Sequence, residues 1–306
     1  MSEIKIQTIA RTASLTAVAM LAFAANSLLC RLALAQDLID AATFTSVRII
    51  AGAVTLGLMV LLRTGPNERQ PTSWRSVAML FTYMTTFSFA YLSLSAGTGA
   101  LLLFGSVQLT MFAVALREGE QFPLRSWGGL SLAMLGLIYL VLPGVTAPDP
   151  FGAVLMTLAG MAWGLYSLLG RGVVDSLAAT ARNFIYSVPL VLIVSLFFFP
   201  MFNASSSGLA LAITSGALTS GCGYVIWYAA LPGLTAMRAA TVQLSVPLIA
   251  AFGGVFLLSE LITLRLLLAS AATLGGVAIV LAQRGSTNRS SEAVPLDPDP
   301  GSGTRQ

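Results

Sequence analysis

The stretch that decides the fold lies near the N-terminus and reads TASLTAVAMLAFAANSLLCRLAL over residues 12–34. It carries no charge before Arg31. A helix that crosses a bilayer needs about 20 predominantly apolar residues, so this stretch is long enough to span one. It also exceeds the apolar region of a signal peptide, roughly 7–15 residues, and has no obvious cleavage site. We therefore expect it to be the first of several membrane-spanning helices.

The composition of the whole chain agrees with this expectation. Of its 306 residues, 56% are apolar and only 9% are charged, with a mean hydropathy of +0.85. About a quarter of the residues of a typical soluble domain are charged, so a soluble enzyme is excluded. The chain has no His and two Cys, both in apolar runs, and we expect no metal or cofactor. Its basic residues lie in loops between apolar runs, so the net charge of +4 does not indicate nucleic-acid binding.

Hydropathy and turn residues divide the chain into ten candidate helices with short loops. Their approximate ranges are 12–34, 41–62, 76–94, 97–116, 126–143, 152–170, 183–202, 208–229, 239–258 and 264–282. If the spans alternate, 13 of the 16 basic residues fall on the side of the N-terminus. Lys and Arg collect in cytoplasmic loops, so we expect an inner-membrane protein with both termini in the cytoplasm. Residues 284–306 are rich in Ser, Pro, Asp and Gly, which predicts a disordered tail.

Short sequence matches about 140 residues apart indicate an internal repeat. SLLCR at residues 27–31 recurs as SLLGR at 167–171, Glu120 recurs as Glu260, and VQL at 107–109 recurs at 242–244. Each half then holds five spans, an odd number, so the second half enters the membrane inverted. Inverted repeats are typical of secondary transporters. We predict an all-α integral membrane protein of ten transmembrane helices in two inverted five-helix repeats, residues 1–145 and 146–283.

These features resemble a known family. The second span contains TSVRIIAG at residues 45–52, with Arg48 early in the helix, and Glu120 and Glu260 stand near the ends of the fourth and ninth spans. Together with ten spans in two halves, they resemble the EamA branch of the drug/metabolite transporter superfamily over about residues 10–284. Within that branch the chain is similar to the YddG-type exporters of aromatic amino acids. The resemblance implies a transporter fold and an exported small molecule.

The spans contain few charged residues, and this restricts the class of substrate. An ionisable side chain at mid-membrane costs at least about 2.5–3.5 kcal/mol, and proton relays through membranes are built from such groups. No Asp or Glu falls clearly at mid-span. Proton-coupled small relatives in the superfamily rely on a Glu in the first helix, where this chain has Asn26. Phosphate recognition calls for several basic residues, and the only Lys is Lys5. These absences favour a neutral or zwitterionic substrate and facilitated diffusion.

Uncharged polar and aromatic residues within the spans are the candidates for substrate binding. Trp163 and Tyr166 are three residues apart and share a helix face. Gln108 and Gln243 occupy corresponding places in the two repeats and would face each other if both line a cavity. The candidate substrate-binding residues are Asn26, Tyr83, Gln108, Trp163, Tyr166, Tyr224, Gln243 and Ser245. Contacts between helices are the alternative for the amides, and a belt at the membrane surface is the alternative for the aromatic residues, Trp227 included.

Three further residues are assigned a gating or structural role. We expect Arg48 to extend toward the membrane surface or to bond carbonyls at helix ends, with a substrate carboxylate as its alternative partner. Pro189 and Pro247 are expected to interrupt the seventh and ninth spans, each freeing a carbonyl. At span ends, Glu118, Glu120 and Glu260 are expected to pair with Arg117, Arg125 or Arg265.

The sequence thus predicts a secondary transporter, not an enzyme, that exports small zwitterionic solutes by alternating access. Aromatic or hydrophobic amino acids are the first candidates. Another neutral metabolite such as a nucleobase is an alternative, and so is a membrane scaffold without transport activity, which would need no substrate-sized cavity. The expected partners are the solute and the lipid bilayer. A monomer is favoured, although small residues at 129, 136, 272 and 276 leave a homodimer open.

Overall fold

The computed structural model describes residues 3–63, 73–117, 119, 124–142, 144, 147–170, 173, 175–230, 242–243 and 245–291. Within these ranges the regular structure is helical, apart from an isolated antiparallel bridge between Ile39 and Ala204. The expected all-α class is confirmed. The longer helices of the first part are α1 (Glu3–Ala35), α2 (Ala41–Leu62), α3 (Trp74–Ala90), α4 (Ala96–Arg117) and α5 (Leu124–Val141). The second part contains α6 (Pro150–Leu169), α7 (Ser176–Phe197), η1 (Phe199–Met201), α8 (Ser206–Thr214), η2 (Ser215–Cys222), α9 (Gly223–Ala230), α11 (Ser245–Leu258) and α12 (Leu264–Ser291).

Seven helical segments of the described chain are long and apolar enough to cross a bilayer. They lie in α1, α2, α4, α5, α6 and α7, and in the continuous run from Ser206 to Trp227 that includes α8, η2 and most of α9. The helix α3 has 17 residues and α11 has 14, and the segment Leu264–Ile279 of α12 is also apolar. The chain is therefore a multi-pass membrane protein.

The helix boundaries depart from the sequence expectation in three places. The seventh span was expected from residue 183, but α7 begins at Ser176 because the Asp175 side chain caps it by accepting from the Ala178 amide. The helix α1 begins at Glu3, before the expected start at residue 12. The helix α12 continues to Ser291, into the expected tail of residues 284–306.

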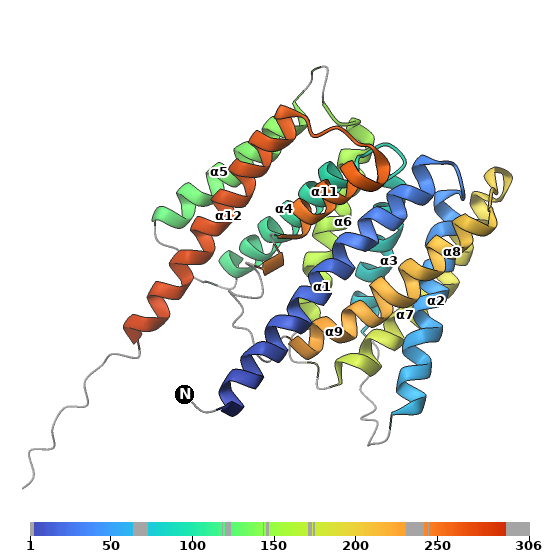
Figure 1. Ribbon diagram of the computed structural model, residues 1–306, viewed down its shortest axis with the longest axis horizontal. Coiled ribbons are helices and arrows are strands. Elements are labelled where there is room, and N and C mark those ends of the chain that lie inside the picture. The colour runs from blue at the N-terminus through green and yellow to red at the C-terminus, as the bar shows by residue number, and fades with distance from the viewer. Residues whose placement is uncertain are drawn as a thin grey trace, which may run out of the picture.

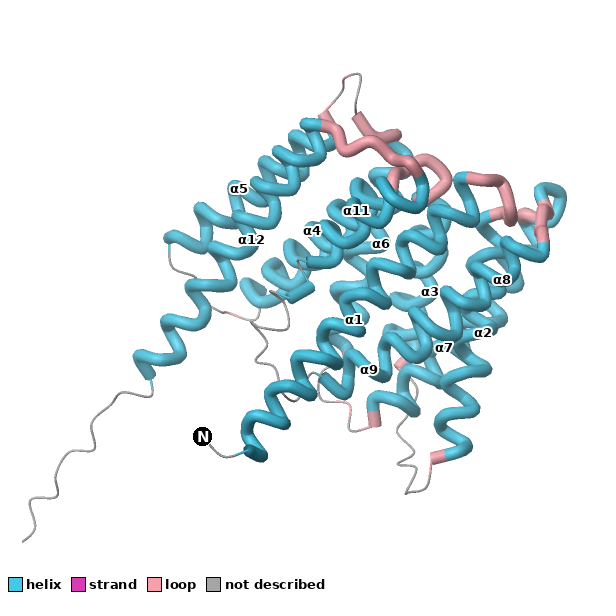
Figure 2. The backbone as a smooth tube through the Cα atoms, in the orientation of Figure 1, coloured by secondary structure: helices cyan, strands magenta, loops and turns pink. Residues whose placement is uncertain are grey.

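The helices form a bundle in which early and late segments are interleaved. Figure 1 shows α5 and α12 side by side on one flank and α2, α7 and α8 on the other. Between the flanks, α6 packs against α3 and α4, while α1 packs against α9 and α11. The first turn of α1 and the last turn of α12 lie at the same end of the bundle (Figure 1). The loops at the opposite end are largely described (Figure 2), and we call this end the loop end.

Glycines permit the closest helix contacts. A Cβ on Gly160 of α6 would lie 2.5 Å from the Leu103 carbonyl oxygen of α4. A Cβ on Gly129 of α5 would lie 2.6 Å from the Gly276 carbonyl oxygen of α12. Small residues let helix backbones approach in a membrane, where lipid gives no hydrophobic drive for association. Of the small residues expected in the fifth and tenth spans, Gly129, Gly136 and Gly276 make close contacts between α5 and α12 of the same chain.

Candidate functional site

A cluster of aromatic rings lies at the centre of the bundle, and Trp163 of α6 is its middle. The Trp163 ring centroid is 4.8 Å from that of Tyr83 on α3 and 5.0 Å from that of Tyr224 on α9. Phe23 of α1 and Tyr166 of α6 are 6.3 and 5.7 Å away. All five side chains are buried. These separations are those of attractive aromatic pairs. Helices from both ends of the sequence therefore meet through one aromatic cluster.

A small cavity lies within this cluster. Its walls include Phe23, Tyr83, Trp163 and Tyr224, and none of its described lining residues is charged. Its volume is about 20 Å³, room for about one water molecule. An amino acid does not fit unless the rings separate, so the structure is a conformation closed around the cavity.

Asn26 gives the cavity its main polar feature. Its side-chain oxygen accepts hydrogen bonds from Ser215 Oγ at 2.7 Å and Thr219 Oγ1 at 3.2 Å. Both hydroxyls belong to η2, a π-helical segment. The i→i+5 pattern of a π-helix widens the turn, so residues four and five apart share a face, and such segments are frequent at functional sites. The wide turn therefore presents several hydroxyls to α1 and α2.

Arg48 lies behind the same cavity and is fully buried. Its Nε donates to Ser220 Oγ at 3.2 Å and its Nη2 donates to Tyr83 Oη at 3.3 Å. The guanidinium carbon lies 4.9 Å from the Phe87 ring centroid and 5.6 Å from that of Tyr83. The expectation that Arg48 reaches the membrane surface or bonds carbonyls is wrong, because side-chain hydroxyls and rings surround it instead.

Part of the Arg48 guanidinium has no partner among the residues that the structure describes. Its Nη1 is buried and makes no hydrogen bond to any of them. Among the described residues the ion pairs are Arg31–Glu260 and Arg63–Asp175, and neither involves Arg48. Within the described part of the chain, rings and neutral hydroxyls surround this positive charge, and no carboxylate pairs with it.

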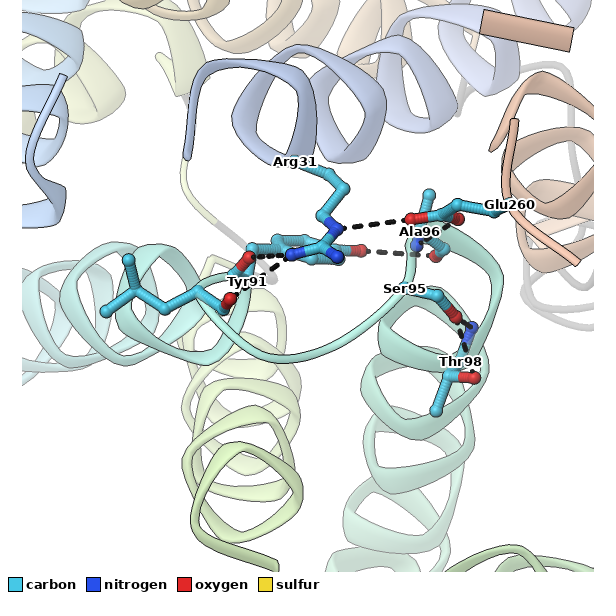
Figure 3. A network of polar contacts seen from close by, with 7 residues as sticks. Arg31, Tyr91, Ser95, Ala96, Thr98 and Glu260 are labelled. Atoms are coloured by element: carbon cyan, nitrogen blue, oxygen red, sulfur yellow. Dashed lines mark hydrogen bonds and ion pairs between the residues drawn. The ribbon is translucent and has the colours of Figure 1, made fainter. Parts of the chain in front are cut away.

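A second polar network closes the loop end of the bundle (Figure 3). Arg31 Nε of α1 donates to Glu260 Oε1 at 3.1 Å, and its Nη1 donates to the Tyr91 carbonyl at 2.9 Å. Glu260 Oε2 accepts from the Ala96 amide at the start of α4, at 2.8 Å. The network joins α1, α3, α4 and the loop between α11 and α12.

The expectation that Glu260 pairs with Arg117, Arg125 or Arg265 is therefore wrong. The packing of α1 against α11 brings Arg31 to Glu260. Arg265 donates instead to the Leu142 carbonyl and lies 5.7 Å from the Tyr139 ring centroid. The other two glutamates of that expectation, Glu118 and Glu120, lie outside the described residues.

The structure brings only part of the predicted binding residues together. Asn26, Tyr83, Trp163 and Tyr224 line the cavity. Tyr166 borders it through its ring contact with Trp163, and its hydroxyl accepts from Asn183 Nδ2 at 3.4 Å. Trp227 is buried against Phe23, with ring centroids 5.9 Å apart, and so belongs to the cluster and not to a surface belt.

The predicted amide pair lies elsewhere. Gln108 and Gln243 are buried, but neither lines the cavity. The Nε2 atom of Gln108 has no hydrogen bond among the described residues. The Ser245 hydroxyl donates to the Val242 carbonyl at 2.6 Å, inside its own segment. The structure therefore does not place these three residues at the cavity.

The two prolines lie within the spans in which they were expected. Pro247 lies in α11 and its side chain is buried, and the expected interruption of the ninth span stays a prediction. Pro189 lies inside α7, which continues through it to Phe197, and its side chain is exposed on the bundle surface.

Several cavity residues were not predicted. Phe23, Phe87, Phe104 and Thr219 all contribute to its wall. In a chain this apolar, a phenylalanine in the core has the same hydropathy as one that faces lipid. One signal was present for Phe87, which follows Tyr83 by four residues and shares its helix face.

Comparisons with known proteins agree with this architecture. The model of the EamA-like transporter family matches residues 150–282. An uncharacterized protein of Pseudomonas aeruginosa is 50% identical over 274 residues, which cover 90% of this chain and 96% of the relative. An uncharacterized transporter of Archaeoglobus fulgidus is 25% identical, with 90% of this chain and 98% of the relative covered.

More distant matches extend the same picture. The uncharacterized transporter YoaV of Bacillus subtilis is 21% identical over 74% of this chain and 82% of its own length. A solved crystal structure superposes with a TM-score of 0.63 at 19% identity, covering 87% of this chain and 98% of that chain, and it shows the fold. The relatives point to a transporter and not to an enzyme. The family model and these relatives agree with the interleaved helices and the central cavity. The chain belongs to the EamA-like transporter family of the drug/metabolite transporter superfamily.

Proposed function

We propose that this protein is an inner-membrane exporter of small zwitterionic solutes, with aromatic and hydrophobic amino acids as its first substrates. It works by alternating access between two inverted five-helix repeats, as a facilitator without proton exchange. Both termini face the cytoplasm, and the monomer is the transporting unit. The observation that carries the proposal is the uncharged aromatic cavity at the junction of early and late helices.

The pattern of helix contacts supports the two repeats. Let α1 to α5 correspond in order to α6, α7, the run α8–η2–α9, α11 and α12. If each helix is replaced by its counterpart, the contact between α3 and α6 becomes the contact of η2 and α9 with α1. In the same way, the contact between α4 and α6 becomes the contact between α11 and α1. The contact between α2 and η2 likewise becomes the contact between α7 and α3. The contacts α2–α7, α4–α11 and α5–α12 are unchanged by the replacement. A pseudo-two-fold axis relating two halves produces such a pattern.

Two further observations support the same topology. The family model covers residues 150–282, the length of one proposed five-helix half. The described ends of α1 and α12 lie at one end of the bundle, as an even number of crossings requires (Figure 1).

The cavity chemistry supports an aromatic substrate. Rings that now contact each other across the cavity would stack on a substrate ring, at about 0.5–1.5 kcal/mol per pair beyond area burial. Asn26 offers an amide to the polar end of the solute. The closed volume of about 20 Å³ fits an occluded state without solute.

The positions of the carboxylates support facilitated diffusion. The described acidic side chains are those of Asp37, Asp40, Asp149, Asp175 and Glu260. Three of them cap helices, and Asp37 and Glu260 lie in loops. None lines the cavity, where a proton-coupled mechanism would place a titrating group.

Uptake of radiolabelled phenylalanine into proteoliposomes tests the proposal. We expect saturable uptake that is the same with and without a pH gradient. Trp163→Ala removes the central ring and should lower uptake about tenfold or more, since it loses several ring contacts. Trp127→Ala is the matched control, because Trp127 is 45% exposed and contacts Phe112, away from the cavity. Unlabelled leucine should compete, and a nucleobase should not.

Three outcomes would contradict the proposal. Uptake no greater than into empty liposomes would remove the amino acid as substrate. If nucleobases compete and amino acids do not, the substrate would be another neutral metabolite. Strict dependence on a proton gradient, abolished by substitution of a glutamate, would replace facilitated diffusion by proton exchange.

A further inference from the structure

We propose that Arg48 is the carboxylate-binding residue of the transport site, so that the protein selects solutes with an apolar body and a free carboxylate. The inference rests on the proposed transport function and names the chemistry that the substrate must carry. It assigns the positive charge behind the cavity a role in recognition, beyond holding helices together.

The first support is the uncompensated charge. A guanidinium has five N–H donors, and the structure gives Arg48 two hydrogen bonds, to Ser220 and Tyr83. Its Nη1 is buried without a hydrogen-bond partner among the described residues, and none of their carboxylates pairs with Arg48. Ionisable side chains inside a membrane normally pair with one another or with backbone carbonyls, and they mark substrate and ion pathways.

The second support is the contrast with Arg31 in the same bundle. Arg31 has a carboxylate partner, Glu260, and also bonds two backbone carbonyls at 2.9 and 3.2 Å. A structural arginine is paired with an anion in this way. Arg48 is buried like a structural residue but has no carboxylate partner among the described residues, which leaves its charge available to an anionic solute.

The third support is the position of Arg48 behind the cavity wall. Tyr83 and Phe87, whose rings contact the guanidinium, both line the cavity. Its hydrogen-bond partner Ser220 adjoins Thr219, another lining residue. Movement of the two rings to admit a solute would expose the guanidinium to it.

The bound chemistry follows from these neighbours. A carboxylate matches the fork of a guanidinium with two parallel hydrogen bonds. The rings around the cavity take the apolar body. A solute with an ammonium group and no carboxylate meets a like charge in a site of low polarity, where repulsion is strong.

Paired ligands that differ only at the carboxylate test the inference. The probes are hydrocinnamate against hydrocinnamide, and hexanoate against hexanamide, with phenethylamine as the cationic analogue. Binding is measured as the shift of the thermal unfolding midpoint of the purified protein. Wild type should bind each carboxylate at least about tenfold more tightly than its amide, and should not respond to phenethylamine.

Variants then assign the preference to Arg48. Arg48→Gln should make each acid and its amide bind equally, and Arg48→Lys should keep part of the preference, because it keeps the charge and loses the fork. Arg265→Gln is the control, since Arg265 bonds the Leu142 carbonyl far from the cavity, and it should keep the full preference. If Arg48→Gln does not fold, the wild-type preference and Arg48→Lys still decide the matter.

The outcomes separate this inference from the proposed function. Equal binding of acids and amides by wild type, or binding of no carboxylate, would overturn the role of Arg48. An acid preference retained in Arg48→Gln would overturn it too. Phenylalanine uptake alongside equal binding would leave transport standing without Arg48. An acid preference that depends on Arg48, without phenylalanine uptake, would support the role of Arg48 and contradict the proposed transport of phenylalanine.

Discussion

At the scale of single residues, the buried amide of Asn26 joins α1 to the π-helical segment. It accepts from two hydroxyls of η2, Ser215 and Thr219, where an ordinary apolar helix would offer no partner. The sequence identifies Asn26 as the polar residue of the first span, but its partners are 189 and 193 residues away in the chain. Only the fold brings them within reach.

Asn26→Ala is expected to destabilise the protein. The change leaves the Ser215 hydroxyl buried without its acceptor, at a cost of about 1–3 kcal/mol. Asn183→Ala is the matched control, because Asn183 is equally buried but makes one longer hydrogen bond, 3.4 Å to Tyr166. The thermal unfolding midpoint should fall more for Asn26→Ala than for Asn183→Ala. Equal decreases would show that the contact with η2 adds nothing specific.

At the scale of helices, the close approach of α5 and α12 depends on one of two adjacent glycines. A Cβ on Gly129 would lie 2.6 Å from a carbonyl oxygen of α12, whereas a Cβ on Gly128 would meet nothing within 4 Å. Gly129→Ala should destabilise the protein by about 1–3 kcal/mol through overpacking. Gly128→Ala should be neutral or slightly stabilising, since Ala favours helices. Thermal unfolding of both variants checks this, and the opposite order would contradict the observed helix pairing.

The polar network at the loop end joins helices through hydrogen bonds and an ion pair. Glu260→Ala removes the partner of the Arg31 side chain and of the Ala96 amide. Arg31 is partly exposed and keeps its two carbonyl partners, but the amide of the buried Ala96 loses its acceptor, at a cost of about 1–3 kcal/mol. The unfolding midpoint should therefore drop clearly. Asp149→Asn, which changes the cap of α6 at the same end, is the control and should have a smaller effect. A Glu260→Ala variant as stable as wild type would show that the network does not hold this end closed.

The ion pair that joins the end of α2 to the start of α7 is sensitive to pH. Arg63 at the end of α2 donates to both carboxylate oxygens of Asp175, at 3.0 and 2.6 Å. This hydrogen bonding, chiefly, holds the pKa of Asp175 below its usual range. The pKa is therefore lower in the folded than in the unfolded protein. The stabilisation is complete above the unfolded-state value of about 3.9 and is lost as pH falls through the folded-state pKa.

Asp175→Asn should accordingly lower the unfolding midpoint modestly at neutral pH and reduce its further fall on acidification below about pH 4. Asn also caps helices well, so the effect reports mainly on the ion pair. Midpoints of wild type and variant, measured between neutral and acidic pH, should converge at the acid end. Parallel curves over the whole range would contradict the assignment.

At the scale of the whole molecule, the proposed orientation can be tested by labelling. Ser207 lies in the first turn of α8 at the loop end, and Arg75 lies in the first turn of α3 at the other, and both are exposed. A membrane-impermeant maleimide should label Ser207→Cys in intact cells and Arg75→Cys only after permeabilisation, in a background with Cys222→Ser. The reverse pattern would invert the topology and make the loop end cytoplasmic.

The sequence alone determined the class of the molecule. Long uncharged runs predict membrane-spanning helices because only such runs can be transferred into a bilayer at low cost. The expected second span coincided with α2, since Asp40 caps its start and the charged Arg63 follows its end. The family was recognised from TSVRIIAG and the repeat. Tyr83, Trp163 and Tyr224 were identified as site candidates because polar aromatic residues are scarce in apolar spans.

Only the tertiary structure decided which residues meet. It paired Glu260 with Arg31, enclosed Arg48 between rings and hydroxyls, and added Phe23 and Phe87 to the cavity, while Gln108 fell outside its walls. In a soluble protein, hydropathy separates the buried face of a helix from its exposed face. In a membrane, lipid is as apolar as the core, so hydropathy does not distinguish a side chain that faces lipid from one that lines the cavity. The site is therefore set by how helices from the two ends of the chain pack together, which no local stretch of sequence encodes.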